Sequence, residues 1–286
     1  MSPPLPAPVF EQFAALLRDR SGLVIGPDKT YLLQTRLAPI LKRDGLADLA
    51  ALAQRLRAPG ASALIDDVVE AMTTNESFFF RDDKPFQHFR AVALPRILGA
   101  RPPGSLIRIW SAAASSGQEA YSLAMILHEC RAQLGERRVE IVGTDIARDQ
   151  LARAREGLYS QFEVQRGLPM AMLVRYFRKE EGGFRINETI RNMVSFREFN
   201  LLADPSPLGR FDIVFCRNVL IYFDIPTKAR VLEAIARRMP PDGLLYLGGA
   251  ETVMGVTSRF VPTAGERGVF SPAPVASVSR LAAAGA

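Results

Sequence analysis

Apolar residues in the first quarter of the chain recur every three or four positions, which is the spacing of one buried helix face. Turn-forming residues interrupt this pattern at Ser21-Gly22, Gly45 and Pro59-Gly60. We therefore predict that residues 9–78 form four short helices without a strand.

The second of these helices, from about Asp28 onward, separates apolar and basic positions most clearly. Its apolar face is predicted to consist of Tyr31, Leu32, Leu37, Ile40 and Leu41. Basic side chains outnumber acidic ones as far as Arg57, because Lys29, Arg36, Lys42, Arg43, Arg55 and Arg57 stand against Asp28, Asp44 and Asp48. The sequence thus predicts a helical region with a modestly basic surface.

After this region, short apolar runs alternate with helical patterns. A helix is predicted over about 84–98, and further helices begin near Gln118, surround Leu151 and extend from about Thr227 to Met239. Buried strands are predicted at 106–110, 139–144, 211–216 and 244–248. Such alternation implies an α/β fold with a doubly wound, mostly parallel sheet and helices on both faces.

The alternation is interrupted between about residues 157 and 193. A short helix at Met170–Phe177 and the turn Glu180-Glu181-Gly182-Gly183 predict a small inserted antiparallel β subdomain with a hairpin. We therefore expect a helical N-terminal domain at 9–78, an α/β domain at 79–270 with this insertion, and a disordered tail at 271–286, which is rich in Ala, Ser and Pro.

Composition narrows the classes of protein further. With 48% hydrophobic and 23% charged residues the chain is typical of a soluble folded protein. Cys130 and Cys216 lie in separate apolar runs, which favours reduced thiols, and no metal-ligand spacing is present. No signal peptide or membrane-spanning run is visible, so we expect a cytoplasmic protein that does not insert into a membrane.

The formal charge of +6 and the pI near 9.6 leave the partner open. They suit an acidic partner, such as nucleic acid or an acidic protein face. The basic residues are nevertheless scattered among acidic ones, which equally suits an ordinary mixed-charge surface.

Residues suited to a ligand site occur in the loops where the predicted strands end. Parallel sheets bind ligands beyond the carboxyl ends of their strands, so the loops after Trp110, after Thr144, near Asn200 and after Cys216 should converge. The first of these loops consists of small residues but lacks the G-x-G-x-x-G pattern, which disfavours a pyrophosphate ligand.

Asp145 ends the second predicted strand, where a carboxylate commonly accepts hydrogen bonds from ribose hydroxyls. A nucleoside without phosphates fits this combination. Taken singly, however, Asp145 equally suits a helix cap, Glu119 a first-turn acid that interacts with the helix dipole, and Asn200 and Asn218 turn residues.

Three strings together decide between these interpretations. They are Thr73-Thr74-Asn75-Glu76-Ser77-Phe78-Phe79-Phe80-Arg81, Trp110-Ser111-Ala112-Ala113-Ala114-Ser115-Ser116-Gly117-Gln118-Glu119, and Phe215-Cys216-Arg217-Asn218-Val219-Leu220-Ile221-Tyr222-Phe223. In this order, after a helical segment, they resemble the chemotaxis receptor methyltransferases, the CheR family, over about residues 9–270. An alanine-rich first loop is itself typical of that family.

The resemblance implies a set of site residues for S-adenosylmethionine and its product S-adenosylhomocysteine. Asn75, Ser77 and Arg81 would reach the cofactor, Glu119 its methionine portion, Asp145 its ribose, and Asn200, Leu201, Asn218 and Val219 its adenine side. Arg81 and Tyr222 would flank the methyl group as catalytic residues. Ser77 departs from the threonine that the family more often has, although it keeps the hydroxyl.

The resemblance also implies the reaction: methyl transfer to glutamate side chains on the cytoplasmic helical bundle of chemotaxis receptors. A glutamate is ionised at neutral pH, so no general base is needed, and we interpret His88 and His128 as structural. The turn near Glu181 is shorter than in members that bind a receptor's C-terminal pentapeptide, so we expect that no such tether is needed. We also expect the protein to be a monomer.

Two alternatives remain at this point. A nucleic-acid methyltransferase agrees with the basic pI, but the string Arg217-Asn218-Val219-Leu220 lacks the prolines that DNA amino-methylating enzymes use to grip a flipped base. A non-catalytic sensor or scaffold that binds S-adenosylmethionine is the other. The residues Arg81 and Tyr222 argue against it.

Overall fold

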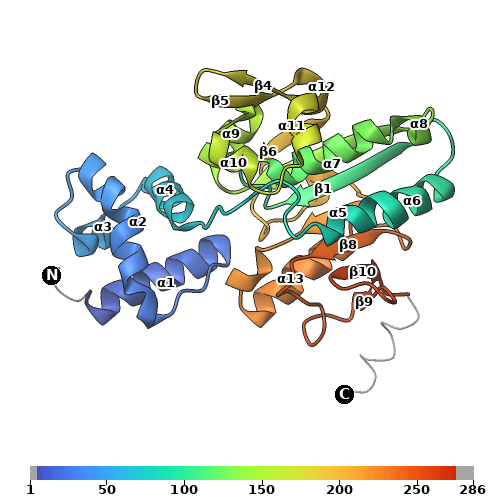
Figure 1. The fold of residues 1–286 in the computed structure, drawn as a ribbon. Helices are drawn as coiled ribbons and strands as arrows, with labels where there is room; N and C mark the ends of the chain where they lie inside the picture. The colour runs from blue at the N-terminus through green and yellow to red at the C-terminus, as the bar shows by residue number, and fades with distance from the viewer. Residues whose placement is uncertain (1–4, 275–286) are drawn as a thin grey trace, which may run out of the picture. The chain divides into compact units, whose positions relative to one another are not determined.

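The computed structural model describes residues 5–274, which form two compact units (Figure 1). One unit contains the residues up to Thr74 together with Tyr222–Thr227, and the other contains Asn75–Ile221 and the chain from Lys228 onward. The first unit is helical and the second is built on a mostly parallel sheet. This confirms the fold class predicted from the sequence.

The first unit has the four predicted helices: α1 (Ala7–Ser21), α2 (Thr30–Arg43), α3 (Leu49–Arg55) and α4 (Ser62–Met72), with a 3-10 turn η1 (Pro27–Lys29) before α2. Their shared core consists of fully buried side chains such as Phe13, Leu17, Leu33, Leu37, Leu52 and Val68. The chain changes direction after α1 at Gly22, whose φ of 78° is readily adopted only by glycine.

The predicted apolar face of α2 was partly wrong. Tyr31 is 59% exposed, whereas Leu33, which the prediction omitted, is fully buried. The buried positions Leu33, Leu37 and Ile40 follow the spacing i, i+4, i+7 of a single helix face, and Tyr31 falls outside it.

Among the described residues, the second unit contains a seven-stranded sheet. In spatial order its strands are β6 (Val194–Glu198), β2 (Arg138–Asp145), β1 (Leu106–Ala112), β7 (Ile213–Cys216), β8 (Leu244–Leu247), β10 (Val269–Pro272) and β9 (Phe260–Pro262). All neighbouring pairs from β6 to β8 are parallel, and β10 runs antiparallel to both β8 and β9.

Helices connect these strands and bury both faces of the sheet. They are α5 (Lys84–His88), the π-helical segment η2 (Phe89–Ala93), α6 (Leu94–Ala100), α7 (Gln118–Glu129), α8 (Arg131–Leu134), α9 (Arg148–Glu156) and α13 (Ile225–Ala236), with 3-10 turns η3 (Ser206–Leu208) and η4 (Leu220–Tyr222). Ile107 and Ile109 of β1 join the core shared with α6 and α7. Trp110 points to the opposite face and stacks on Phe211, with ring centroids 5.3 Å apart.

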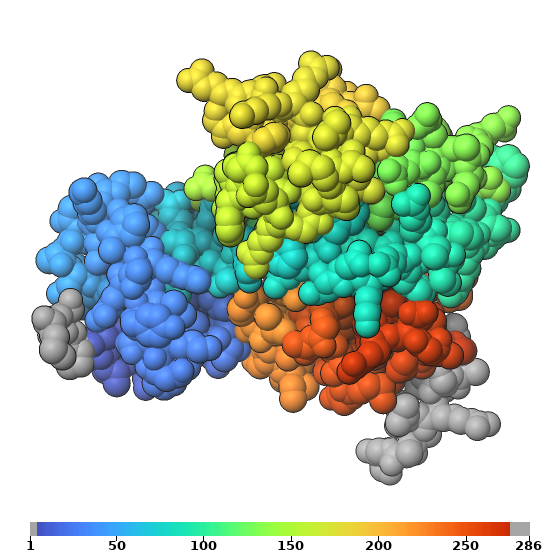
Figure 2. Space-filling model, viewed as in Figure 1, coloured from blue at the N-terminus to red at the C-terminus, as the bar shows by residue number. Residues whose placement is uncertain are grey.

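The inserted subdomain is a three-stranded antiparallel sheet, β3 (Leu158–Tyr159), β5 (Gly183–Ile186) and β4 (Phe177–Glu180), with the short helices α10 (Gln161–Gln165), α11 (Met170–Tyr176) and α12 (Glu188–Arg191). The predicted hairpin is β4–β5. Figure 2 shows this subdomain, yellow-green to yellow, standing out from the surface of the sheet domain.

Four strands were not predicted: β3 of the inserted subdomain, β6, and the antiparallel pair β9 and β10. Ser271 and Pro272, which we assigned to the tail, belong to β10, and residues 275–286 lie outside the described range. No helix within residues 5–274 is long and apolar enough to cross a membrane.

Candidate functional site

The strand order of the sheet marks one place for a ligand. The chain proceeds from β1 to β2 and β6 on one side, and the later strands β7 and β8 lie on the other side. The order therefore reverses between β1 and β7. In open parallel sheets the crevice at such a reversal, beyond the carboxyl ends of the strands, is where ligands bind.

The loop after β1 has an unusual backbone at this reversal. Ala113, Ser115 and Gly117 have φ values of 63°, 49° and 91°. A left-handed conformation is costly for non-glycine residues and persists only where surrounding contacts enforce it. Those contacts include the bond from Ala114 N–H to the Thr144 carbonyl, 2.8 Å, and the Ser115 hydroxyl, which donates to the Asn75 carbonyl at 3.0 Å.

Asp145, at the carboxyl end of β2, fixes this loop from the other side. Its Oδ2 accepts from Ser115 N–H at 2.7 Å and its Oδ1 from Ala147 N–H at 2.9 Å. The residue is only 7% exposed. Ala147 is the N-cap residue of α9, and this N-cap has no side-chain cap bond among the described residues, so Asp145 does not cap this helix. Its bond to Ser115 ties the carboxylate to the ligand-side loop.

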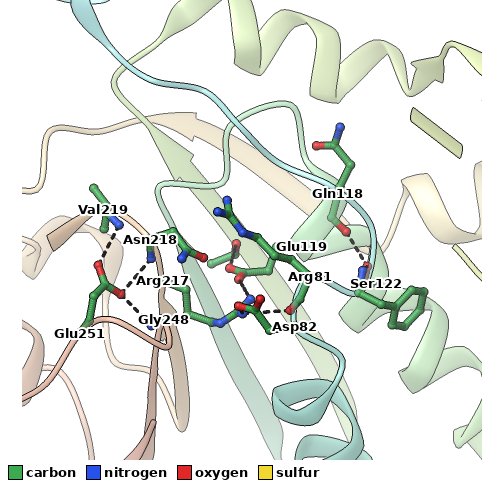
Figure 3. Close-up of polar contacts among 12 residues, drawn as sticks. Arg81, Asp82, Gln118, Glu119, Ser122, Arg217, Asn218, Val219, Gly248 and Glu251 are labelled. Carbon is green, nitrogen blue, oxygen red and sulfur yellow. Dashed lines mark hydrogen bonds and ion pairs between the residues drawn. The ribbon is translucent and has the colours of Figure 1, made fainter. Parts of the chain in front are cut away.

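Glu119 lies in the first turn of α7, and its carboxylate joins two further elements. Oε1 accepts from the Ser111 hydroxyl of β1 at 2.8 Å, and Oε2 accepts from Arg217 Nη1 at 2.9 Å. The other terminal nitrogen of Arg217 donates to the Arg81 carbonyl at 2.9 Å and to the Asp82 carboxylate at 2.7 Å. Figure 3 shows Arg217 lying between Glu119 and Asp82.

Arg81 follows an aromatic run and is partly exposed, at 22% of its side chain. Its Nη1 donates to the Glu76 carbonyl at 2.7 Å, and its guanidinium lies 5.3 Å from the centroid of the Phe78 ring. Arg166 lies over the same ring at 4.3 Å and pairs with the Glu76 carboxylate at 2.5 Å. The guanidinium of Arg81 is therefore oriented by Glu76 and Phe78, which lie shortly before it in the chain.

The loop after β7 is held by Glu251, a residue that follows β8. Its carboxylate accepts from the backbone N–H groups of Asn218, Val219 and Gly248 at 2.6–2.9 Å (Figure 3). It also accepts from Ile221 N–H at 3.2 Å. Asn218 has a φ of 59°, so the loop is again left-handed at a non-glycine residue. Glu251 thus fixes the loop that carries two of the predicted adenine-side residues.

We expect Glu251→Gln to lower the free energy of unfolding by on the order of 1 kcal/mol and to weaken cofactor binding, because an amide NH₂ would face backbone donors. Thermal unfolding and calorimetric titration with S-adenosylhomocysteine measure the two effects. Glu266→Gln, a change of the same kind in the exposed turn before β10, is the matched control. Equal cofactor affinity in Glu251→Gln and the parent would mean that the loop does not need this carboxylate.

The remaining predicted residues have different surroundings. Asn200 follows β6 and its side chain accepts from Leu202 N–H at 3.0 Å, so it does form a turn, and Leu201 is half-buried beside it. Phe199 N–H donates to the Asp145 carbonyl at 2.9 Å, which brings this turn next to the end of β2. Ser77 is half-buried in the segment that contains Arg81.

Tyr222 is assigned to the helical unit, where its carbonyl accepts from Val24 N–H at 2.9 Å. Its position beside a methyl group stays a prediction. Arg217 and Glu251 were not predicted as site residues. Arg217 stood within a recognised string, and Glu251 follows a predicted strand, so the rule that ligands bind at the carboxyl ends of strands was the available signal for both.

Each of the two histidines is hydrogen-bonded to a tyrosine within the fold. His88 Nδ1 is 2.8 Å from the Tyr246 hydroxyl, and His128 Nδ1 is 3.1 Å from the Tyr176 hydroxyl. Burial lowers the pKa of both imidazoles, and burial also raises the pKa of the Cys216 thiol well above its usual value. These pKa shifts favour the neutral form of all three side chains near pH 7, and for Cys216 they disfavour the thiolate, which is the nucleophilic form of a thiol.

The arrangement fits a nucleoside cofactor without phosphates. It offers a buried carboxylate at the end of β2, a loop of small residues that a ligand can approach, and Glu119 beside them. A carboxylate at this strand end accepts hydrogen bonds from vicinal hydroxyls, and the loop after β1 lacks the glycine pattern that binds a pyrophosphate.

Known proteins resemble the chain over nearly all of this structure. Residues 8–73 match the family described as "CheR methyltransferase, all-alpha domain", and residues 75–269 match "CheR methyltransferase, SAM binding domain". "Chemotaxis protein methyltransferase Cher2" of Pseudomonas putida is 40% identical over 255 residues, which cover 88% of this chain and 92% of that protein. "Chemotaxis protein methyltransferase 1" of Pseudomonas aeruginosa is also 40% identical, with the same coverage.

Among solved structures, PKMT2 from Rickettsia typhi in complex with AdoHcy has a TM-score of 0.36 and 14% identity, covering 61% of this chain and 26% of that one. This likeness is too distant to indicate a function.

Proposed function

The chain belongs to the CheR methyltransferase family, and from this premise we propose that it is a protein-glutamate O-methyltransferase of chemotaxis receptors. It is an S-adenosylmethionine-dependent methyltransferase of the chemotaxis type. The observation that carries the proposal is the match of both halves of the chain to this family, together with relatives named as chemotaxis protein methyltransferases.

The cofactor is S-adenosylmethionine, whose sulfonium supplies an activated methyl group. We assign its ribose to Asp145 and its methionine portion to Glu119, and we assign its adenine to the loops of Asn200-Leu201 and Asn218-Val219. Asn75, Ser77 and Arg81 complete this set. The positions of Asp145 and Glu119 around the loop after β1 support the assignment.

The acceptor is a glutamate carboxylate, which ordinarily has a pKa of about 4.3, so it is ionised at neutral pH and needs no general base. That no base is required agrees with the two histidines, which are both engaged with tyrosines in the fold. In-line transfer requires the acceptor oxygen and the methyl group to be aligned at near-attack distance. The enzyme's task is therefore orientation.

Arg81 orients the acceptor in this proposal. Its planar fork can hold a carboxylate through two hydrogen bonds, and the Glu76 carbonyl and the Phe78 ring support its guanidinium. A tight ion pair would stabilise the ground state, so the benefit of Arg81 must come from geometry. Tyr222 would form the other side of the methyl site, as a hydrogen-bond donor or as an aromatic wall.

The partner is proposed to be the helical bundle of a receptor in the cytoplasm, bound by the basic surface of the helical unit. Three of the basic residues counted from the sequence are occupied within that unit, and one of them is Arg57, whose Nη2 donates to the Gln12 side chain at 2.6 Å. Arg36 donates to the carbonyls of Met72 and Thr73, and Arg43 pairs with Asp44 and Asp67. The exposed residues Lys29 and Lys42 are better candidates for receptor contact.

We expect the double change Lys29→Glu with Lys42→Glu to lower kcat/KM for receptor about tenfold, while cofactor affinity is unchanged. The loss should shrink with added salt, because exposed charges are screened within about 10 Å at 0.1 M. The control Arg230→Glu with Arg237→Glu makes the same change of charge at exposed positions of the other unit. Equal losses in the two double variants would exclude a docking role for Lys29 and Lys42.

The inserted hairpin has strands of four residues joined by Glu181-Gly182. This short connection supports our expectation that a C-terminal peptide tether on the receptor is not required. Receptors with and without their last residues should therefore be methylated at similar rates.

The proposal is tested by incubating the protein with tritiated S-adenosylmethionine and receptor-enriched membranes. We expect label in the receptor that is released by mild base, as a glutamyl methyl ester requires. Tight cofactor binding without transfer would instead identify a sensor or scaffold, and label in added nucleic acid would identify the other alternative.

A further inference from the structure

Arg217 makes an unusual set of contacts for a residue outside the predicted site. Its side chain is 1% exposed, yet its two terminal nitrogens contact three separate groups. These groups are the Glu119 carboxylate in the first turn of α7, and the Arg81 carbonyl and Asp82 carboxylate near the start of the second unit. A buried guanidinium is costly unless well paired, so these contacts explain how it is tolerated.

The segment that Arg217 contacts is strained. Phe80, Asp82 and Asp83 have φ values of 51°, 67° and 49°, so three of the four residues from 80 to 83 are left-handed without being glycine. Such a turn persists only where its surroundings over-determine it. Arg217 supplies two of the bonds that do so, and Phe80 N–H donates a third to the Ser122 hydroxyl of α7 at 3.0 Å.

The buried position of Arg217 also carries a cost in free energy. Within the described residues its buried Nε has no hydrogen-bond partner, although both terminal nitrogens are used. A buried donor without a partner is unfavourable. The side chain is thus positioned for its terminal contacts, and a lysine in its place has no planar fork with which to reach Glu119 and Asp82 in different directions.

We propose that Arg217 is a positioning residue, which sets the place of Arg81 relative to the methionine end of the cofactor. It does so by binding the main chain of Arg81 with one nitrogen and the carboxylate of Glu119 with the other. The inference rests on the proposed function, because it assumes that Arg81 orients the acceptor carboxylate. The Arg217 guanidinium then links Arg81, which holds the acceptor carboxylate, to Glu119, which lies beside the methionine end of the cofactor.

A double-mutant cycle between Arg217→Lys and Arg81→Ala tests this inference. The measurement is the single-turnover rate of receptor methylation at saturating cofactor and receptor. We expect Arg217→Lys alone to lower the rate by on the order of tenfold to a hundredfold, as for a misplacement of about 1 Å. In the Arg81→Ala background the same change should cost less than about twofold, because the group that it positions is gone.

Two further variants keep the test independent of stability. Arg101→Lys disrupts a comparable arginine, 18% exposed and paired with Asp212 and Asp242 before β7 and β8, and should lower the thermal midpoint without lowering the transfer rate. Asp82→Ala changes a half-exposed carboxylate. If Arg217→Lys does not fold, Asp82→Ala should show a smaller loss that also disappears in the Arg81→Ala background.

The outcomes distinguish a failure of the inference about Arg217 from a failure of the proposed function. Transfer by the parent, with a loss from Arg217→Lys that depends on Arg81, supports the inference. Equal losses from Arg217→Lys in both backgrounds, or no loss at all, would overturn it and leave the proposed function intact. A parent that transfers no methyl group to receptor glutamates would overturn the proposed function, and the inference with it.

Discussion

Arg81→Ala is expected to lower the rate of methyl transfer about a hundredfold or more at saturating cofactor. The arginine would align the acceptor carboxylate through two hydrogen bonds, and a misalignment of about 1 Å costs about a hundredfold in rate. In the structure Arg81 is directed by the Glu76 carbonyl and the Phe78 ring. Arg81→Lys should rescue poorly, since an ammonium group lacks the planar fork.

Two measurements separate binding from orientation: equilibrium binding of S-adenosylhomocysteine and single-turnover methylation of receptor. Arg166→Ala is the matched control, because Arg166 contacts the same ring and the same glutamate and should change the rate only a fewfold. A parental rate for Arg81→Ala once cofactor saturates would leave Arg81 as a binding residue at most.

Asp145→Ala is expected to weaken cofactor binding by about 1.5 to 3 kcal/mol, because bonds from ribose hydroxyls to a charged acceptor are lost. The structure adds a second cause. The carboxylate also holds Ser115 N–H, so the loop after β1 loses an anchor on the ligand side. The fold should persist, since the surrounding strands are paired over their full length.

Calorimetric titration with S-adenosylhomocysteine measures this effect. Asp145→Asn retains one acceptor oxygen and should lose less affinity than Asp145→Ala. Asp149→Ala, in the first turn of α9, controls for the loss of a negative charge near the same helix. If Asp145→Ala folds and binds cofactor as the parent does, the role of Asp145 is limited to its bonds to Ser115 and Ala147.

The elements that could be predicted from sequence are those with strong local patterns. β1 and β2 are apolar runs bounded by turn residues, and α7 begins where the small-residue loop ends. The hairpin β4–β5 was marked by its glycines. Each of these signals lies within a few residues of the element that it predicts.

The missed strands lack such signals. β6 reads Val-Ser-Phe-Arg-Glu and is only half-buried, and β9 is three residues long and ends in proline. β6 is stabilised by pairing with β2, about fifty residues earlier in the chain, so its strand conformation depends on tertiary contacts rather than local pattern. The face of α2 was misplaced because Tyr31 and Leu33 are both apolar enough to suit a buried position.

The residues of the candidate site also fall into two groups: those that the sequence indicated and those whose partners only the folded structure shows. Asp145 was indicated by its position at a strand end as well as by the resemblance, and Glu119 by the resemblance; the structure brings both to the loop after β1. The resemblance supplied no role for Arg217 or Glu251, although Arg217 binds Glu119, 98 positions away in sequence, and Glu251 binds Val219, 32 positions away. A local string can reveal that an arginine is present but not which distant carboxylate it binds.

The most direct test of the central claim is peptide mass spectrometry of receptor that has been methylated by the purified protein with isotope-labelled S-adenosylmethionine. We expect labelled methyl esters on glutamate side chains of the receptor's cytoplasmic helices, lost after mild base and absent with Arg81→Ala. Label on any other side chain, or on nucleic acid, or no label despite bound cofactor, would contradict the claim.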